Sequence, residues 1–191
     1  IGHMAATYWD NPSHKLKLVG VTGTNGKTTV SNLLTSILTE NGYTVTNNSF
    51  GSNVQAGVIS TLIAECTLGG KCKKDIAVLE VDERSSLLIY PYLAPDYLVC
   101  NNIMRDSVKR NAHTDFISFI INKGIPAGTK LILNADDTIC AHLGLNNPDR
   151  TYFGISAEVP WPFWTSAERT EPRRGRELPQ GARINHLSQQ P

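Results

Sequence analysis

The chain has 191 residues, of which 40% are hydrophobic and 18% are charged. Such a composition is typical of one globular domain, alone or with an appendage, with enough apolar residues to bury a core. The formal net charge of +1 excludes a general electrostatic affinity for nucleic acid or for membrane surfaces.

The N-terminal region carries no signal-peptide pattern, and no apolar run approaches the roughly 18 residues of a membrane span. Ile1-Gly2-His3-Met4 looks like an expression-vector scar, so residues 1–14 are expected to be this scar and a lead-in to the fold. The four cysteines include no C-x-x-C pair, which favours reduced thiols over a metal site. These features predict a cytoplasmic protein without an integral membrane segment.

The first two predicted elements are a strand over residues 16–21 and a helix over residues 28–40. Apolar residues in the helix recur at i, i+3, i+4, i+7 and i+8, which is the spacing of one buried face. Asn41-Gly42 then ends the helix. The residues expected to be buried are Val30, Leu33, Leu34, Ile37 and Leu38.

The loop between these two elements has the sequence T-G-T-N-G-K-T-T over residues 22–29. A glycine-rich loop between a strand and a helix directs backbone N–H groups and the positive end of the helix dipole to one point. A lysine there reaches the outer phosphates of a nucleotide, and the following threonine hydroxyl binds Mg²⁺. Val21 stands where the usual P-loop pattern has its first glycine. The loop predicts a triphosphate site made of Gly23, Thr24, Asn25, Gly26, Lys27, Thr28 and Thr29.

Further along the chain, strands and helices are expected to alternate. Three continuous apolar runs, at 76–79, 97–100 and 130–133, indicate strands that are covered on both faces. This predicts an α/β doubly wound domain over residues 15–160, with three layers, a mostly parallel sheet and a ligand crevice at the carboxyl ends of the strands. The remaining expected elements are a strand at 43–46, a helix at 54–66 and a helix that buries Phe116, Phe119, Ile120 and Ile121.

Acidic residues follow the apolar run at 76–79. An acidic residue at the end of a strand beside a P-loop holds Mg²⁺ directly or through water, so Glu80 is the expected magnesium ligand. Asp82 and Glu83 are interpreted as groups that surround the metal site or contact the substrate. The alternative is a helix N-cap with acidic residues in the first turn.

Polar residues also follow the other two buried strands. Asn102 comes after the run at 97–100, and Asn134 and Asp136 come after the run at 130–133. Each group alone is explained by an Asx turn that caps the next helix, but their shared position at strand ends favours nucleotide contacts. The nearest match to the guanine-reading N-K-x-D motif is residues 122–125, which has Ile125 in place of the aspartate. ATP is therefore expected rather than GTP.

The C-terminal segment, residues 161–191, differs in composition from the rest of the chain. It contains no lysine, and its arginines and prolines follow no usable periodicity. This favours a disordered or foreign tail, such as vector-derived or out-of-frame residues after a truncated domain. A natural basic tail that binds an acidic partner is the alternative.

Several motifs together resemble the Mur ligase family, to which the folylpolyglutamate synthases are related. They are T-G-T-N-G-K-T-T at 22–29, N-S-F-G-S-N at 48–53, L-E-V-D-E at 79–83, N-I-M-R-D at 102–106, L-N-A-D-D at 133–137 and Y-F-G-I at 152–155. The resemblance covers about residues 14–157. Within the family it is to the MurT-like branch, the ligase subunits of lipid II isoglutaminyl synthases.

The resemblance implies the fold of a Mur ligase central domain and an enzyme of peptidoglycan synthesis. Such enzymes use ATP to phosphorylate a carboxylate, and a nitrogen nucleophile then attacks the acyl phosphate. In the MurT-like branch the carboxylate is the α-carboxyl of D-glutamate in the lipid II stem peptide, and the nucleophile is ammonia from a GatD-type glutaminase. The resemblance gives Gly23 to Lys27 the phosphates and gives Thr28 and Glu80 the Mg²⁺. Lys27 and Glu80 are therefore the expected catalytic residues.

The chain also departs from the family pattern. Asp106 is followed by Ser107, where amino-acid-adding Mur ligases usually have histidine, and Lys123 is out of register with their carbamylated lysine. Both departures favour the MurT-like branch over another Mur-type ligase or a folylpolyglutamate synthase. The zinc-ribbon cysteines and the C-terminal domain of MurT-like proteins are not visible, so the chain is expected to be a fragment. A non-catalytic ATP-binding module is the remaining alternative.

Overall fold

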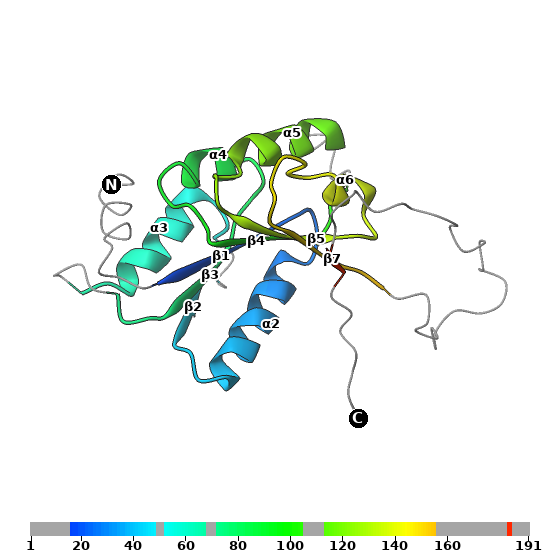
Figure 1. The fold of residues 1–191 in the computed structure, drawn as a ribbon. Helices are drawn as coiled ribbons and strands as arrows, with labels where there is room; N and C mark the ends of the chain where they lie inside the picture. Colours follow the sequence, from blue (N-terminus) through cyan, green and yellow to red (C-terminus); the bar gives the residue numbers. More distant parts are fainter. Residues whose placement is uncertain (1–15, 49–51, 68–71, 105–112, 156–182, 185–191) are drawn as a thin grey trace, which may run out of the picture.

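The computed structural model describes residues 16–48, 52–67, 72–104, 113–155 and 183–184. Within these residues, seven strands form one sheet in the order β2-β3-β1-β4-β5-β6-β7, and every neighbouring pair is parallel (Figure 1). The strands are β1 (Lys17–Thr22), β2 (Val45–Asn47), β3 (Ile76–Glu80), β4 (Tyr97–Cys100), β5 (Lys130–Asn134), β6 (Arg150–Phe153) and β7 (Arg183–Ile184).

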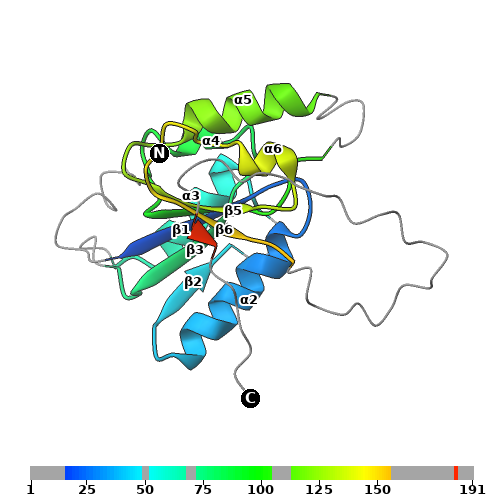
Figure 2. The same cartoon turned by 45° about the vertical axis from the view of Figure 1, so that its right-hand side comes forward.

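Helices lie on both faces of the sheet. Helix α2 (Lys27–Glu40) covers one face, and Figures 1 and 2 show the other helices of the described chain on the opposite face. These are α3 (Gln55–Ala64), α4 (Ser86–Ile89), α5 (Thr114–Gly124) and α6 (Thr138–Ala141). The predicted three-layer α/β architecture with a parallel sheet is confirmed.

Strand β3 shows why the central strands are apolar throughout. Val78 packs into the cluster beneath α2, whereas Ala77 and Leu79 belong to the larger cluster on the opposite face. Successive side chains of a strand point to opposite faces, so a strand with helices on both sides must be apolar at every position. All five residues of β3 are buried, including Glu80. The continuous apolar runs were therefore a sound signal of central parallel strands.

The predicted buried faces of two helices are partly wrong. Leu33 and Ile37 of α2 are 56% and 48% exposed, whereas Val30, Leu34 and Leu38 pack against the sheet. A helix in an outer layer touches the sheet along a narrow stripe, so apolar residues beside that stripe remain in solvent.

In α5, the two phenylalanines Phe116 and Phe119 are exposed. The buried residues of this helix are Ile117, Ile120 and Ile121. The prediction was thus correct for two of its four residues. The guanidinium of Arg84 lies 5.9 Å from the centre of the Phe116 ring, so this exposed ring takes part in a cation–π contact.

The boundaries of the predicted strands and helices lie within two residues of those found. Strands β6 and β7 and the short helices α4 and α6 were not predicted as elements, although helix caps or Asx turns were the alternative interpretation of the polar residues that precede α4 and α6. Arg183 and Ile184 pair with β6 although they lie in the segment expected to be a disordered or foreign tail. The rest of that segment lies outside the described residues, so the domain boundary at residue 160 remains a prediction. In the part of the chain that is described, no helix has the length and apolar character needed to cross a membrane.

Strands β1 and β4 are neighbours whose connections leave in opposite directions. After β1 the chain passes through α2 to β2, and after β4 it continues to β5 on the other side of the sheet. Such a switch point opens a crevice outside the carboxyl ends of the two strands. The loop after Thr22 and the segment after Cys100 both lie at this point.

Candidate functional site

The loop after β1 depends on two glycines with positive φ. Gly23 has φ 122° and lies against the backbone of Asn101 and Asn102, and Gly26 has φ 78° and is the N-cap of α2. Side-chain-bearing residues rarely adopt such φ values, and a β-carbon at Gly23 would lie 2.8 Å from the carbonyl oxygen of Asn102. The glycines therefore allow the loop to lie directly on the end of β4.

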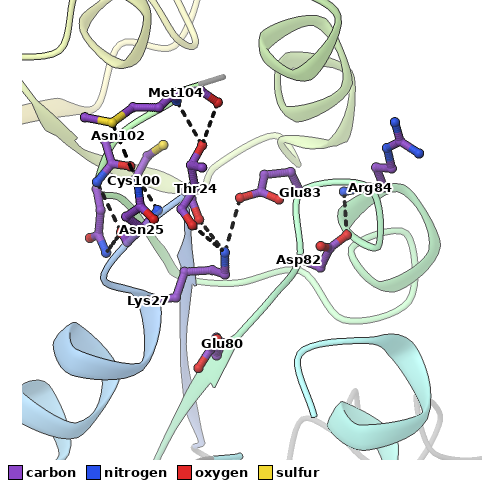
Figure 3. Close-up of polar contacts among 12 residues, drawn as sticks. Thr24, Asn25, Lys27, Glu80, Asp82, Glu83, Arg84, Cys100, Asn102 and Met104 are labelled. Carbon is purple, nitrogen blue, oxygen red and sulfur yellow. Dashed lines mark hydrogen bonds and ion pairs between the residues drawn. The ribbon is translucent and has the colours of Figure 1, made fainter. Parts of the chain in front are cut away.

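The segment that follows β4 holds this loop through a set of reciprocal hydrogen bonds. The backbone N–H of Thr24 donates to the carbonyl of Asn102 (2.9 Å), and that of Asn25 donates to Asn102 Oδ1 (3.0 Å). Asn102 Nδ2 donates back to the carbonyl of Asn25 (3.1 Å), and Met104 N–H donates to Thr24 Oγ1 (2.9 Å). Figure 3 shows these residues meeting above α2. Asn102 and Met104 thus fix the shape of the loop.

These contacts divide the N–H groups of the loop into two kinds. Those of Thr24 and Asn25 are occupied by Asn102. Among the described residues, the N–H groups of Gly26, Lys27, Thr28 and Thr29 have no acceptor, since they form the first turn of the 14-residue helix α2. Free N–H groups and the helix dipole together favour an anion at this end of α2.

The Lys27 ammonium lies inside the loop. It donates to the carbonyls of Gly23 and Thr24, and its Nζ is 3.4 Å from Glu83 Oε1. The side chains of Lys27 and Glu83 are 12% and 2% exposed, so the ion pair is largely shielded from water. Lys27 therefore has a buried counter-charge at the position where phosphate is expected.

Thr28 and Glu80 lie together beside this pair. The Thr28 hydroxyl donates to Glu80 Oε2 (2.9 Å), and Glu80 is only 5% exposed although it carries a carboxylate. Hydroxyl and carboxylate oxygens are the ligands that Mg²⁺ prefers. The donor set present in this chain therefore fits a magnesium ion next to the anion site.

Asp82 and Glu83 have different roles. Asp82 Oδ1 accepts hydrogen bonds from the N–H groups of Arg84 (3.1 Å) and Ser85 (3.4 Å), which form an Asx turn just before α4, whose N-cap is Ser85. Glu83 instead faces Lys27, as Figure 3 shows. The two acids had the same predicted role. Their different partners follow only from the fold.

Asn134 and Asp136 lie one strand further from the loop. Asn134 Nδ2 donates to the carbonyl of Asn101 (2.8 Å), and Asn101 Nδ2 in turn donates to the carbonyl of Asn25 (3.3 Å). Asp136 Oδ2 accepts from the N–H of Ile155 (2.8 Å). Asn134 thus reaches the loop through Asn101, and nucleotide contacts for Asn134 and Asp136 stay a prediction.

Three residues of this site were not predicted as site residues. Met104 braces Thr24, Asn101 links β5 to the loop, and Asn48 binds the backbone of Glu80. Asn101 is 7% exposed, and its Oδ1 has no partner among the described residues. Asn48 and Asn101 also come after strands. The rule that selected Asn102, a polar residue at the end of a strand, would have selected them too.

The buried Glu83 carboxyl should make the free energy of unfolding depend on pH. Burial raises the pKa of Glu83 above its ordinary 4.5, although the Lys27 ammonium acts in the opposite direction. The folded state then binds a proton more tightly than the unfolded state, so the free energy of unfolding should fall as pH rises from 4.5 through the raised pKa. Urea denaturation across this range should show a smaller fall for Glu83→Gln. Parallel curves for the two proteins would contradict the assignment.

A comparison with protein families matches residues 21–178 to the Mur ligase middle domain, which extends past the predicted boundary at residue 160. The chain is 36% identical over 147 residues to the MurT subunit of the glutamine-hydrolysing lipid II isoglutaminyl synthase of Staphylococcus aureus strain COL. It is 35% identical over 146 residues to the subunit of the same name from Streptococcus pneumoniae. Each match covers 74% of this chain and 32% of the relative, so the chain spans about a third of the length of these curated relatives.

Solved structures share the fold. MurF ligase from Thermotoga maritima in complex with ADP superposes with a TM-score of 0.63 at 19% identity, over 80% of this chain and 35% of that chain. MurF from Acinetobacter baumannii gives a TM-score of 0.66 at 20% identity, over 81% and 34% of the two chains. At such identities the likeness establishes the architecture.

Proposed function

Because the chain belongs to the Mur ligase family, we propose that it is the nucleotide-binding part of an ATP-dependent ligase that forms a C–N bond. One observation carries this proposal, namely the meeting of three features at the carboxyl edge of the sheet. They are the free N–H groups at the start of α2, the Lys27 ammonium and the Thr28–Glu80 oxygen pair. Phosphate, the charge on its oxygens and its metal ion each have a matching group there.

Each residue of the loop then has a defined task. The N–H groups of Gly26, Lys27, Thr28 and Thr29 hold phosphate oxygens, while Gly23, Thr24 and Asn25 shape the loop through Asn102. Thr28 and Glu80 would hold Mg²⁺. Bound ATP would supply the phosphoryl group that activates a carboxylate. Lys27, now paired with Glu83, would turn to the phosphates and would stabilise negative charge there during phosphoryl transfer.

The finer proposal is a MurT-like reaction in peptidoglycan synthesis. The carboxylate is the D-glutamate α-carboxyl of the lipid II stem peptide, and a GatD-type glutaminase supplies the ammonia. Its support is the identity to two MurT subunits over 74% of the chain. We place the reaction in the cytoplasm, where ATP is available. Another Mur-type ligase, a folylpolyglutamate synthase or a non-catalytic ATP-binding module would share the same nucleotide site.

Calorimetric titration with Mg-ATP and Mg-GTP tests the nucleotide site. We expect ATP to bind and GTP to give no binding heat, because residues 122–125 lack the aspartate that reads guanine. Binding of GTP as tightly as ATP would contradict the ATP assignment. Adding a muropeptide and a GatD-type glutaminase to the chain with ATP then separates the alternatives. ADP release that requires the acceptor supports a ligase and rules out the non-catalytic ATP-binding module.

A further inference from the structure

The edge of β3 that faces β2 is only partly paired by backbone. Strand β2 ends at Asn47, and its register with β3 runs from Val45–Ile76 to Asn47–Val78. Glu80, the last residue of β3, lies beyond this ladder. Its N–H and carbonyl on that edge therefore need other partners, because buried backbone groups without hydrogen bonds are costly.

The side chain of Asn48 supplies both partners. The Glu80 N–H donates to Asn48 Oδ1 (2.7 Å), and Asn48 Nδ2 donates to the Glu80 carbonyl (2.8 Å). The same Nδ2 also donates to the carbonyl of Ser52 (2.9 Å), and Asn48 is 4% exposed. A carboxamide here reproduces the pair of hydrogen bonds that a neighbouring strand would make.

Glu80 is also held on its other side. It stands opposite Val21 in the parallel register with β1, and the N–H of Val81 donates to the Val21 carbonyl (2.9 Å). The backbone at Glu80 is thus fixed from both edges at the point where its side chain meets Thr28. Because this backbone is already ordered, binding of a ligand by the carboxylate does not carry the entropy cost of ordering it.

We propose that Asn48 is a positioning residue for divalent metal, because it fixes the backbone from which Glu80 directs its carboxylate to Thr28. This inference rests on the proposed function, since it assigns Mg²⁺ to Thr28 and Glu80. Asn48 itself does not touch the metal. Its effect should therefore appear in the metal dependence of nucleotide binding more than in nucleotide binding without metal.

The competing explanation is that Asn48 only stabilises the sheet edge. In that case its loss would lower the melting temperature and would weaken nucleotide binding equally with and without metal. Asn47 offers a matched control, because it is the preceding residue, and its Nδ2 donates to Thr35 Oγ1 (2.9 Å) on α2. Asn47→Ala removes an amide contact from the neighbouring residue and keeps the Asn48 side chain that bonds the Glu80 backbone.

The test is an ATP titration of the wild type, Asn48→Ala and Asn47→Ala across a range of Mg²⁺ concentrations, with a parallel titration in EDTA. We expect Asn48→Ala to need about 10- to 100-fold more Mg²⁺ for half-maximal enhancement of ATP binding, the usual effect of removing a group that orients a metal ligand. Affinity in EDTA should stay at the wild-type value. Asn47→Ala should keep the wild-type Mg²⁺ requirement.

An unchanged Mg²⁺ requirement in Asn48→Ala, beside normal binding by the wild type, overturns the inference alone. Binding of Mn²⁺ is followed by electron paramagnetic resonance. If the wild type binds neither Mg-ATP nor Mn²⁺, the proposed function is overturned, and this inference with it. Should Asn48→Ala not fold, Asn48→Ser replaces it, because a short hydroxyl cannot reach both backbone groups of Glu80. The same Mg²⁺ shift is expected for that variant, and its absence counts against the role.

Discussion

Lys27→Ala is expected to lower ATP affinity by about 30-fold to more than about 1,000-fold. Removing one member of a buried, hydrogen-bonded charge pair costs about 2–5 kcal/mol, and each 1.4 kcal/mol is about tenfold in the dissociation constant. The Lys27 ammonium lies within the loop, next to the free N–H groups at the start of α2. Calorimetry with Mg-ATP measures the loss directly.

Two further variants show whether this loss is specific. Lys17→Ala removes a lysine at the opposite end of β1 from the loop, whose Nζ pairs with Asp96 at a 63% exposed site, and it should bind ATP like the wild type. Lys27→Ala also leaves Glu83 buried without its counter-charge, which by itself destabilises the fold. The double variant Lys27→Ala/Glu83→Gln removes that problem, so it should regain stability but not ATP affinity. Wild-type affinity in the double variant would refute a phosphate-binding role for Lys27.

Gly23→Ala is expected to destabilise the protein by about 2–5 kcal/mol and to abolish the anion site. The new β-carbon would lie 2.8 and 3.0 Å from backbone atoms of Asn102 and 3.1 Å from the backbone nitrogen of Asn101, at a φ of 122°. Backbone atoms cannot rotate away as a side chain can, so overpacking and strained φ add together. Urea denaturation gives the loss of stability, and calorimetry with Mg-ATP gives the loss of binding.

Gly42→Ala separates these two causes. Gly42 also has a positive φ, 87°, but a β-carbon there meets nothing within 4 Å. Its substitution should cost only the strain of the left-handed conformation, about 1–2 kcal/mol, with ATP affinity unchanged. If Gly23→Ala were no more harmful than Gly42→Ala, the close approach between the loop and the end of β4 would not be needed for the fold.

The Lys27 ammonium is already paired with Glu83 before any phosphate binds. A phosphate that binds at α2 competes with Glu83 for the same ammonium, so part of the binding free energy is used to separate a buried ion pair. Glu83→Gln removes this competition. Calorimetry with Mg-ATP is therefore expected to show that Glu83→Gln binds ATP at least as tightly as the wild type.

The architecture could be predicted from the sequence, and so could the location of the candidate site. Continuous apolar runs identified central parallel strands, because a strand covered on both faces must be apolar throughout. The run T-G-T-N-G-K-T-T between a strand and a helix predicts the candidate anion site, because such a site depends on a local backbone shape. Glu80 was predicted to lie near this loop because parallel strands end at the same edge of a sheet.

Which polar groups of that site are free and which are hydrogen-bonded follows only from the folded arrangement of the chain. Thr24 and Met104 are 80 residues apart in the sequence, and Lys27 and Glu83 are 56 apart, so no local pattern reveals that they meet. The same holds for Asn48, whose amide is useful only because β2 stops one residue earlier beside β3. Local patterns report backbone conformation and burial, whereas the pairing of polar groups depends on how distant strand ends are brought together.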